Sequence, residues 1–168
     1  MDIICGIRSP TRGSVLFNGV RYGANSILPV DVFYLPQEPL IIPKTILENV
    51  SMLEREYISK SQEELVISCL KQVGLLTSTV SSDSFINSAV GPDGDKLSGG
   101  QKQRLVLARA LYHGAEVLAL DEIVSGLEAN SKREVLELLQ ELAAAKKLVI
   151  LISHDQVAEE FSSKCLSL

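Results

Sequence analysis

The chain has 168 residues, of which 46% are hydrophobic and 22% charged, a balance typical of a soluble globular domain. Its formal net charge of -5 argues against a broad basic face for nucleic acid, and its apolar runs are far shorter than the ~20 residues of a membrane-spanning helix. Its cysteines, Cys5, Cys69 and Cys165, are scattered and form no C-x-x-C pair, which indicates neither a disulfide framework nor a zinc site and favours a reducing compartment.

The N-terminal part predicts a helix end followed by a hairpin. Residues 1–9 read as the last turns of a helix that stops at Pro10, because a proline ring disfavours helix in the residue before it. Asn18-Gly19 is a strong hairpin signal, so we expect a small antiparallel ribbon within residues 13–22.

A strand and a helical region follow. Residues 30–35 are β-branched and aromatic and end at Pro36, which predicts a strand with Gln37 at its exit. Residues 45–90 read as a helical insertion with a polar Ser/Thr loop at 77–84. Two segments in it have the spacing of a capping box ahead of an apolar run, Thr45-x-x-Glu48 and Ser61-x-x-Glu64, and Gly74 closes the second helix.

From residue 98 onward, helices and strands alternate. The helices are expected at residues 98–112, 131–145 and 156–161, and the strands at 116–120, 148–152 and 164–168. Continuously apolar strands that alternate with helices predict a parallel sheet covered by helices, so the fold class is α/β.

The helix at 98–112 opens with Ser98-Gly99-Gly100-Gln101. Ser98 with Gln101 fits a capping box, so one interpretation is simply a well-capped helix. Two glycines in the first turn, however, cost roughly 0.8–1 kcal/mol each relative to alanine. Without Cβ atoms the free N–H groups of a helix start are open to a phosphate. The motif therefore also predicts a phosphate contact.

The exits of the expected strands carry residues suited to phosphoryl chemistry. Asp121-Glu122 can hold Mg²⁺ with the first carboxylate and orient or deprotonate the attacking water with the second. Gln37 and His154 follow two other strands. Each alone has an ordinary interpretation as a loop, cap or surface residue. Their joint occurrence at one sheet edge favours a ligand site.

These strings resemble the motifs of ATP-binding cassette (ABC) ATPases. "LSGGQKQRLVLARAL" is similar to the signature motif, "VFYLPQ" to the Q-loop, "VLALDE" to the Walker B strand, "SGLE" to the D-loop and "LISHD" to the switch histidine. The resemblance runs the whole chain. It implies a P-loop NTPase-type sheet core in residues 1–37 and 115–168, with a helical subdomain over residues 45–113 that includes the signature.

The resemblance implies ATP and Mg²⁺ as cofactors and a role for each matching residue. Gln37 would sense Mg²⁺ and the attacking water, Asp121 would support Mg²⁺, Glu122 would polarise the water and His154 would contact the γ-phosphate. A second cassette would pair head to tail with this one, and the γ-phosphate of its ATP would be contacted by four adjacent residues, Ser98, Gly99, Gly100 and Gln101.

Two departures from the family pattern matter. No G-x-x-x-x-G-K-[ST] P-loop occurs in the 168 residues, and in the family a segment like residues 3–19 follows the P-loop helix at once. We therefore expect an N-terminally truncated cassette that completes a partner's site but does not hydrolyse ATP at its own. The D-loop reads Ser125-Gly126-Leu127-Glu128 where the family has Ser-Ala-Leu-Asp, which alters its contact with a partner.

The resemblance implies a transporter ATPase at the cytoplasmic face of a membrane, either peripheral or fused to a membrane domain. "AVGPDG" before the signature favours exporters. The apolar loop of Leu40, Ile41 and Ile42 is either a surface for the membrane domain or a satellite of the core.

Other functions and partners stay open or are disfavoured. The alternatives are a catalytically silent module that completes or regulates a partner's ATP site, and a soluble non-transport ABC ATPase. The compact middle segment disfavours the latter. Lys102, Arg104 and Arg109 are read as a solvated helix face or a local phosphate contact, and no nucleic acid is expected as a partner.

Overall fold

The computed structural model describes residues 1–22, 31–77, 81–145 and 147–165, and its centre is a three-stranded parallel sheet. The strands are β3 (Val32–Leu35), β4 (Val117–Asp121) and β5 (Leu148–Ile152), in the order β3-β4-β5. Because β4 is flanked on both sides, its residues 117–120 are all buried. The register pairs Leu35 with Leu120 and Asp121 with Ile152, so the carboxyl ends of the three strands share one edge.

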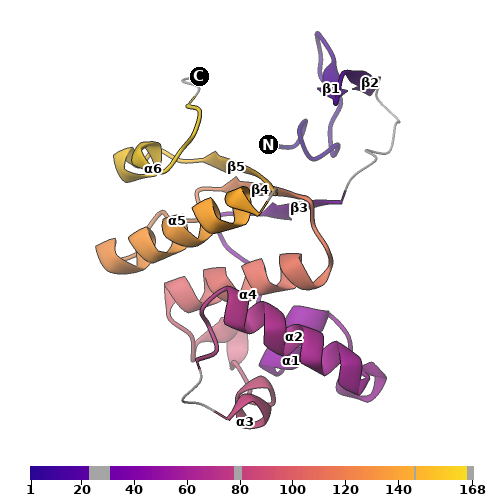
Figure 1. Ribbon diagram of the computed structural model, residues 1–168, viewed down its shortest axis with the longest axis vertical. Helices are drawn as coiled ribbons and strands as arrows, with labels where there is room; N and C mark the ends of the chain where they lie inside the picture. The colour runs from indigo at the N-terminus through magenta and orange to yellow at the C-terminus, as the bar shows by residue number, and fades with distance from the viewer. Residues whose placement is uncertain (23–30, 78–80, 146, 166–168) are drawn as a thin grey trace.

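Helices lie in layers beneath this sheet (Figure 1). α5 (Ala129–Ala144) crosses next to the strands and connects β4 to β5, and α4 (Gly99–Tyr112) lies beyond it. α1 (Ile46–Ser51) and α2 (Lys60–Gln72) pack on the far side of α4. The short elements are the 3₁₀ turns η1 (Arg55–Tyr57) and η2 (Pro92–Gly94) and the helices α3 (Ser82–Ile86) and α6 (Gln156–Glu160).

The N-terminal ribbon lies at the opposite end of the molecule from α1–α3 (Figure 1). β1 (Val15–Phe17) pairs antiparallel with β2 (Val20–Tyr22), as the sequence predicted. Asn18 and Gly19 between them have φ of 49° and 80°, which a two-residue hairpin turn requires. Before the ribbon, residues 1–8 form helix-like turns in which the Cys5 N–H donates to the Met1 carbonyl at 3.1 Å.

One apolar cluster joins the sheet to the helices. Its fully buried members include Leu35, Leu118 and Leu120 of the sheet, Leu105 and Leu107 of α4, and Leu47 and Leu70 of α1 and α2. α4 contributes to this cluster along most of its length because it is covered by α5 on one face and by α1 and α2 on the other. The described residues include no helix with both the length and the apolar character needed to cross a bilayer.

The structure corrects several sequence expectations. The helix predicted to start at Ser61 is capped two residues earlier, because Ser59 and Gln62 form the capping box. The polar loop predicted over residues 77–84 contains the start of α3. A strand was predicted over residues 164–168, but Lys164 and Cys165 do not form one, and residues 166–168 lie outside the described residues. Residue 30, predicted to begin a strand, lies outside them as well.

Candidate functional site

Asp121 is the last residue of β4 and is held by a tyrosine from the neighbouring strand. The Tyr34 hydroxyl donates to Asp121 Oδ2 at 3.0 Å. Tyr34 lies opposite Ala119, and residues two apart along a strand share a face, so its ring points along β4 toward Asp121. Burial and this hydrogen bond raise the pKa of Tyr34, so its hydroxyl remains a donor at neutral pH.

Glu122 leaves the strand in an unusual backbone conformation. Its N–H donates to the Ile152 carbonyl at 2.9 Å, and its φ is 53°, in the left-handed region that costs a non-glycine residue about 1–2 kcal/mol. Strain of this kind is found at functional sites. The turn places the carboxylate beside the segment that follows β5 (Leu148–Ile152).

His154 is the second residue of that segment, and its imidazole faces Glu122. His154 Nε2 lies 3.4 Å from Glu122 Oε1, with the imidazole 94% exposed and the carboxylate 18% exposed. Among the described residues, Glu122 Oε1 is buried and has no hydrogen-bond partner, so the 3.4 Å contact does not satisfy it. A buried carboxylate oxygen without a donor has a free lone pair for a water or a substrate proton.

Gln37 is exposed two residues beyond β3. Since Leu35 at the end of β3 pairs with Leu120, Gln37 follows the same sheet edge that carries Asp121, Glu122 and His154. The sequence therefore identified the edge correctly, although none of its motifs indicated the contribution of Tyr34.

The signature residues lie at the start of α4. Ser98 Oγ accepts from the Gln101 N–H at 3.3 Å, and Gln101 Oε1 accepts from the Ser98 N–H at 2.9 Å, a complete capping box. A Cβ built on Gly99 would lie 2.9 Å from Leu127 Cδ2, and one on Gly100 would lie 3.3 Å from Ser131 Cβ. The glycines therefore permit close packing of the D-loop and the start of α5 against the signature.

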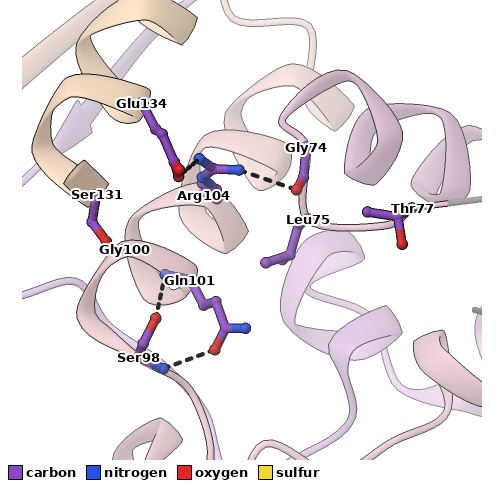
Figure 2. A pocket seen from close by; sticks show the side chains of 9 residues that line it. All are labelled: Gly74, Leu75, Thr77, Ser98, Gly100, Gln101, Arg104, Ser131 and Glu134. Carbon is purple, nitrogen blue, oxygen red and sulfur yellow. Dashed lines mark hydrogen bonds and ion pairs between the residues drawn. The ribbon is translucent and has the colours of Figure 1, made fainter. Parts of the chain in front are cut away.

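A cavity of about 290 Å³ opens beside this helix start (Figure 2). Figure 2 shows Arg104 between Gly74 and Glu134 at its wall, donating to the Gly74 carbonyl at 3.1 Å and pairing with Glu134 at 2.5 Å. The other lining residues are Leu75, Thr77, Ser98, Gly100, Gln101 and Ser131.

The cations of α4 bind groups of the chain itself. Lys102 Nζ donates to the Asp93 carbonyl at 2.8 Å, Arg104 bridges Gly74 and Glu134, and Arg109 is buried. They therefore do not form a solvated basic face, which corrects one of the two interpretations drawn from the sequence.

The sheet edge carries side-chain oxygens, the ligand atoms that Mg²⁺ prefers. In the described residues no three His, Cys, Asp or Glu side chains gather as a ligand cluster. Nucleotide-bound Mg²⁺ usually needs only one or two protein oxygens, because phosphates and waters supply the rest. The Asp121 carboxylate and the Gln37 amide oxygen fit that requirement.

The sequence and the fold are similar to those of known proteins. The sequence pattern of the ABC transporter family matches residues 1–125. The chain is 32% identical over 148 residues to an ATP-dependent lipid A-core flippase of Cupriavidus pinatubonensis, covering 84% of the chain and 24% of the relative. It is 37% identical to the human mitochondrial potassium channel ATP-binding subunit, covering 86% of the chain and 20% of the relative. The chain thus spans a fifth to a quarter of the length of these relatives.

Among solved structures, the dimeric ATP-binding cassette MJ0796 in a post-hydrolysis state bound to ADP and Pi has a TM-score of 0.70 at 25% identity. The match covers 95% of this chain and 70% of that cassette.

Proposed function

The chain belongs to the ABC transporter family, and we propose that it forms the nucleotide-binding part of a transporter in which ATP binding and hydrolysis drive transport across a membrane. The observation that carries the proposal is the approach of Glu122 Oε1 and His154 Nε2 to 3.4 Å beside Asp121 at the carboxyl edge of the sheet. We assign Glu122 and His154 as catalytic residues.

In this proposal Glu122 holds the attacking water. Its Oε1, which is buried and has no hydrogen-bond partner among the described residues, accepts a hydrogen bond from the water and then its proton. As the water oxygen bonds to the γ-phosphorus, the bond from that phosphorus to the bridging β-phosphate oxygen breaks, and ADP leaves with that oxygen. His154, largely exposed, presents its imidazole to the γ-phosphate. Asp121 and Gln37 would hold Mg²⁺, which neutralises phosphate charge when bound. Tyr34 keeps Asp121 oriented through its hydrogen bond of 3.0 Å.

The signature serves a second nucleotide. We propose that Ser98, Gly99, Gly100 and Gln101 contact the γ-phosphate of ATP held by another cassette in a head-to-tail pair. The capping box leaves the N–H groups of Gly99 and Gly100 at the helix start, where an anion is favoured. The solved MJ0796 relative is described as dimeric, which supports a paired arrangement.

We further propose a membrane-domain partner and a location at the cytoplasmic face. Leu40 in the loop before the helical region, and Met52 and Tyr57 within that region, are 64%, 44% and 68% exposed, while Ile41 is buried in the core. The loop predicted from sequence thus divides into a core residue (Ile41), a half-buried residue (Ile42) and an exposed residue (Leu40), and the exposed side chains suit a protein contact. Relatives named as a flippase and an export ATP-binding/permease protein favour export.

The division into a catalytic core (residues 1–37 and 115–168) and a helical subdomain (45–113) is part of the same proposal. The continuous apolar cluster across α4 means that the two parts share a core here.

A second candidate is a catalytically silent module. It is favoured by one observation, that no G-x-x-x-x-G-K-[ST] sequence occurs in the 168 residues. We propose that these residues alone do not hydrolyse ATP, since their sequence contains no P-loop motif for the β- and γ-phosphates.

Attaching a P-loop separates the two candidates. ATP turnover is measured for the chain alone and for the chain preceded by the P-loop strand and helix of the lipid A-core flippase relative. We expect turnover only in the extended form, abolished by Glu122→Gln and unaffected by Glu137→Gln, an exposed glutamate on α5. An extended chain that folds and binds ATP without turnover would support the silent module, and turnover by the chain alone would contradict the proposed incompetence.

A further inference from the structure

A buried arginine joins the signature helix to the segment that follows Gln37. Arg109, near the end of α4, is 6% exposed, and Asn49 of α1 is fully buried beside it. Neither residue belongs to the sites described above. Burying a charged guanidinium is costly unless its donors are matched, so its partners are informative.

Among the described residues, every hydrogen-bond partner of Arg109 is a neutral oxygen. Nε donates to the Asn49 carbonyl at 2.7 Å, Nη1 to the Leu40 carbonyl at 3.0 Å, and Nη2 to Asn49 Oδ1 at 3.4 Å. No carboxylate of the described residues pairs with Arg109, and burial lowers the pKa of its guanidinium. The charge is therefore used to hold backbone carbonyls and an amide, not to form an ion pair.

Asn49 extends this network to the next residues of the same segment. Its Nδ2 donates to the Ile42 carbonyl at 2.9 Å and to the Thr45 carbonyl at 3.0 Å, and its Oδ1 accepts from the Ile42 N–H at 3.0 Å. Leu40–Ile42 has no regular secondary structure, so two side chains supply hydrogen bonds that a sheet or helix would otherwise provide.

We propose that Arg109 and Asn49 are positioning residues that fasten the segment after Gln37 to the signature helix. The purpose of the link rests on the proposed function: Gln37 serves the nucleotide of its own chain, and Ser98 at the other end of α4 serves the partner's nucleotide. Any shift of the Gln37 loop is then passed to the signature helix through direct hydrogen bonds. A role in stability alone explains the arrangement poorly, because desolvating a guanidinium is costly and apolar residues often replace even buried ion pairs without loss of stability.

The test measures amide hydrogen exchange by NMR in the 168-residue chain. The Ile42 amide reports the network, and the Leu118 amide in the central strand reports global stability. Arg109→Met retains an apolar stem without the donors, and Asn49→Ala removes the direct partner of the Ile42 amide. We expect each to accelerate Ile42 exchange about tenfold relative to Leu118, the effect of losing a hydrogen bond to a charged or buried group.

Arg104→Met is the matched control, because Arg104 lies on the same helix and binds a backbone carbonyl of a different segment. It should leave the ratio of Ile42 to Leu118 exchange unchanged. The Arg109→Met, Asn49→Ala double variant should exchange at Ile42 no more than about twofold faster than the faster single variant, since both act on one network.

Equal acceleration of Ile42 and Leu118 in Arg109→Met would show a merely structural role and overturn the proposal, as would an unchanged Ile42 rate or fully multiplicative effects. The readout involves no nucleotide. Failure of the link is therefore distinguishable from failure of the ATPase assignment, which the Glu122→Gln comparison tests.

Discussion

Removing the Ser98 hydroxyl separates the capping role of the signature from its proposed ligand role. In the part of the chain that the structure describes, three helices begin with complete capping boxes, headed by Thr45, Ser59 and Ser98. Ser59→Ala is the matched control for Ser98→Ala, because both serines are exposed and each accepts the N3 backbone N–H, at 3.4 Å and 3.3 Å. Each variant loses the cap bond to the N3 backbone N–H, and Ser59→Ala also loses exposed contacts of its hydroxyl with Gln62 Oε1 and Ser61 Oγ.

The expected stability cost is small and similar for the two serines. Loss of a cap costs about 0.5–2 kcal/mol, and the long distance of 3.3 Å at an exposed site places Ser98→Ala near the lower end. In Ser98→Ala the Gln101 side-chain oxygen can still accept a hydrogen bond from the backbone N–H of residue 98. For a domain of this size we expect the Tm to fall by about 2–4 °C per kcal/mol in either variant, measured by thermal denaturation.

Association with ATP distinguishes the two variants. The extended chain described above, carrying Glu122→Gln so that ATP stays intact, is tested for ATP-dependent dimerisation by sedimentation. Ser98→Ala should weaken the dimer by at least about a hundredfold, because each of the two signatures in a head-to-tail pair of identical chains loses a hydrogen bond to a charged phosphate worth about 1.5–3 kcal/mol. Ser59→Ala should leave the dimer unchanged. Equal weakening in both variants, or a strong ATP-dependent dimer in Ser98→Ala, would refute the assignment of Ser98 to the partner's nucleotide.

Three further predictions follow from individual residues. Gly126→Ala, which introduces the family's usual D-loop residue, should lower the free energy of unfolding by about 1–2 kcal/mol in urea titrations, because alanine is strained at the φ of 74° that Gly126 adopts. An added Cβ would meet no other atom, so this backbone strain is the whole expected cost. Hydrogen bonding to Lys132 lowers the pKa of Asp155. The Asp155–Lys132 pair therefore stabilises the fold fully above the ordinary Asp pKa of about 3.9, and this stabilisation is lost as the pH falls through the lowered pKa. Lys132→Met should therefore reduce the fall of Tm at acidic pH. In thiol labelling, exposed Cys165 should react first, whereas Cys69, whose pKa burial raises, should react only on unfolding.

The parallel sheet was predictable because apolar β-strand runs alternate with helical patterns, and the structure pairs β3, β4 and β5 in parallel as expected. The start of α2 was harder to predict, because its sequence contains two overlapping capping-box patterns, Ser59 with Gln62 and Ser61 with Glu64. Local spelling alone does not decide between them. The structure uses the earlier one, which extends α2 to Lys60–Gln72 and buries Val66, Cys69 and Leu70 along one face.

The short helix α3 was missed for a different reason. Its sequence is polar at the start, so the composition resembles a loop, but Phe85 and Ile86 at its end pack against the apolar cluster of the other helices. Tertiary packing of this kind overrides a weak local preference, and no periodic pattern is visible in five residues.

The candidate site divides in the same way between what motifs reveal and what geometry adds. The motifs predicted Asp121, Glu122 and His154 as site residues, whereas the contact of 3.4 Å between Glu122 Oε1 and His154 Nε2 depends on the adjacency of β4 and β5 and on the left-handed φ of Glu122. No residue pattern encodes that conformation, since glutamate seldom adopts it. Glu122 is held there by one backbone hydrogen bond to Ile152 and by the burial of the next residues, Ile123 and Val124.

The cationic side chains of α4 show why the sequence of one helix does not predict which segments its residues contact. Lys102, Arg104 and Arg109 look alike in sequence, yet each ends at a carbonyl of a different segment: Asp93 before the signature, Gly74 after α2, and Asn49 in α1. α4, the helix that starts with Ser98, therefore holds three separate segments of the chain. We expect a ligand that moves the start of α4 to move these segments as well, because all three hydrogen bonds are charge-assisted and that of Arg109 is also buried.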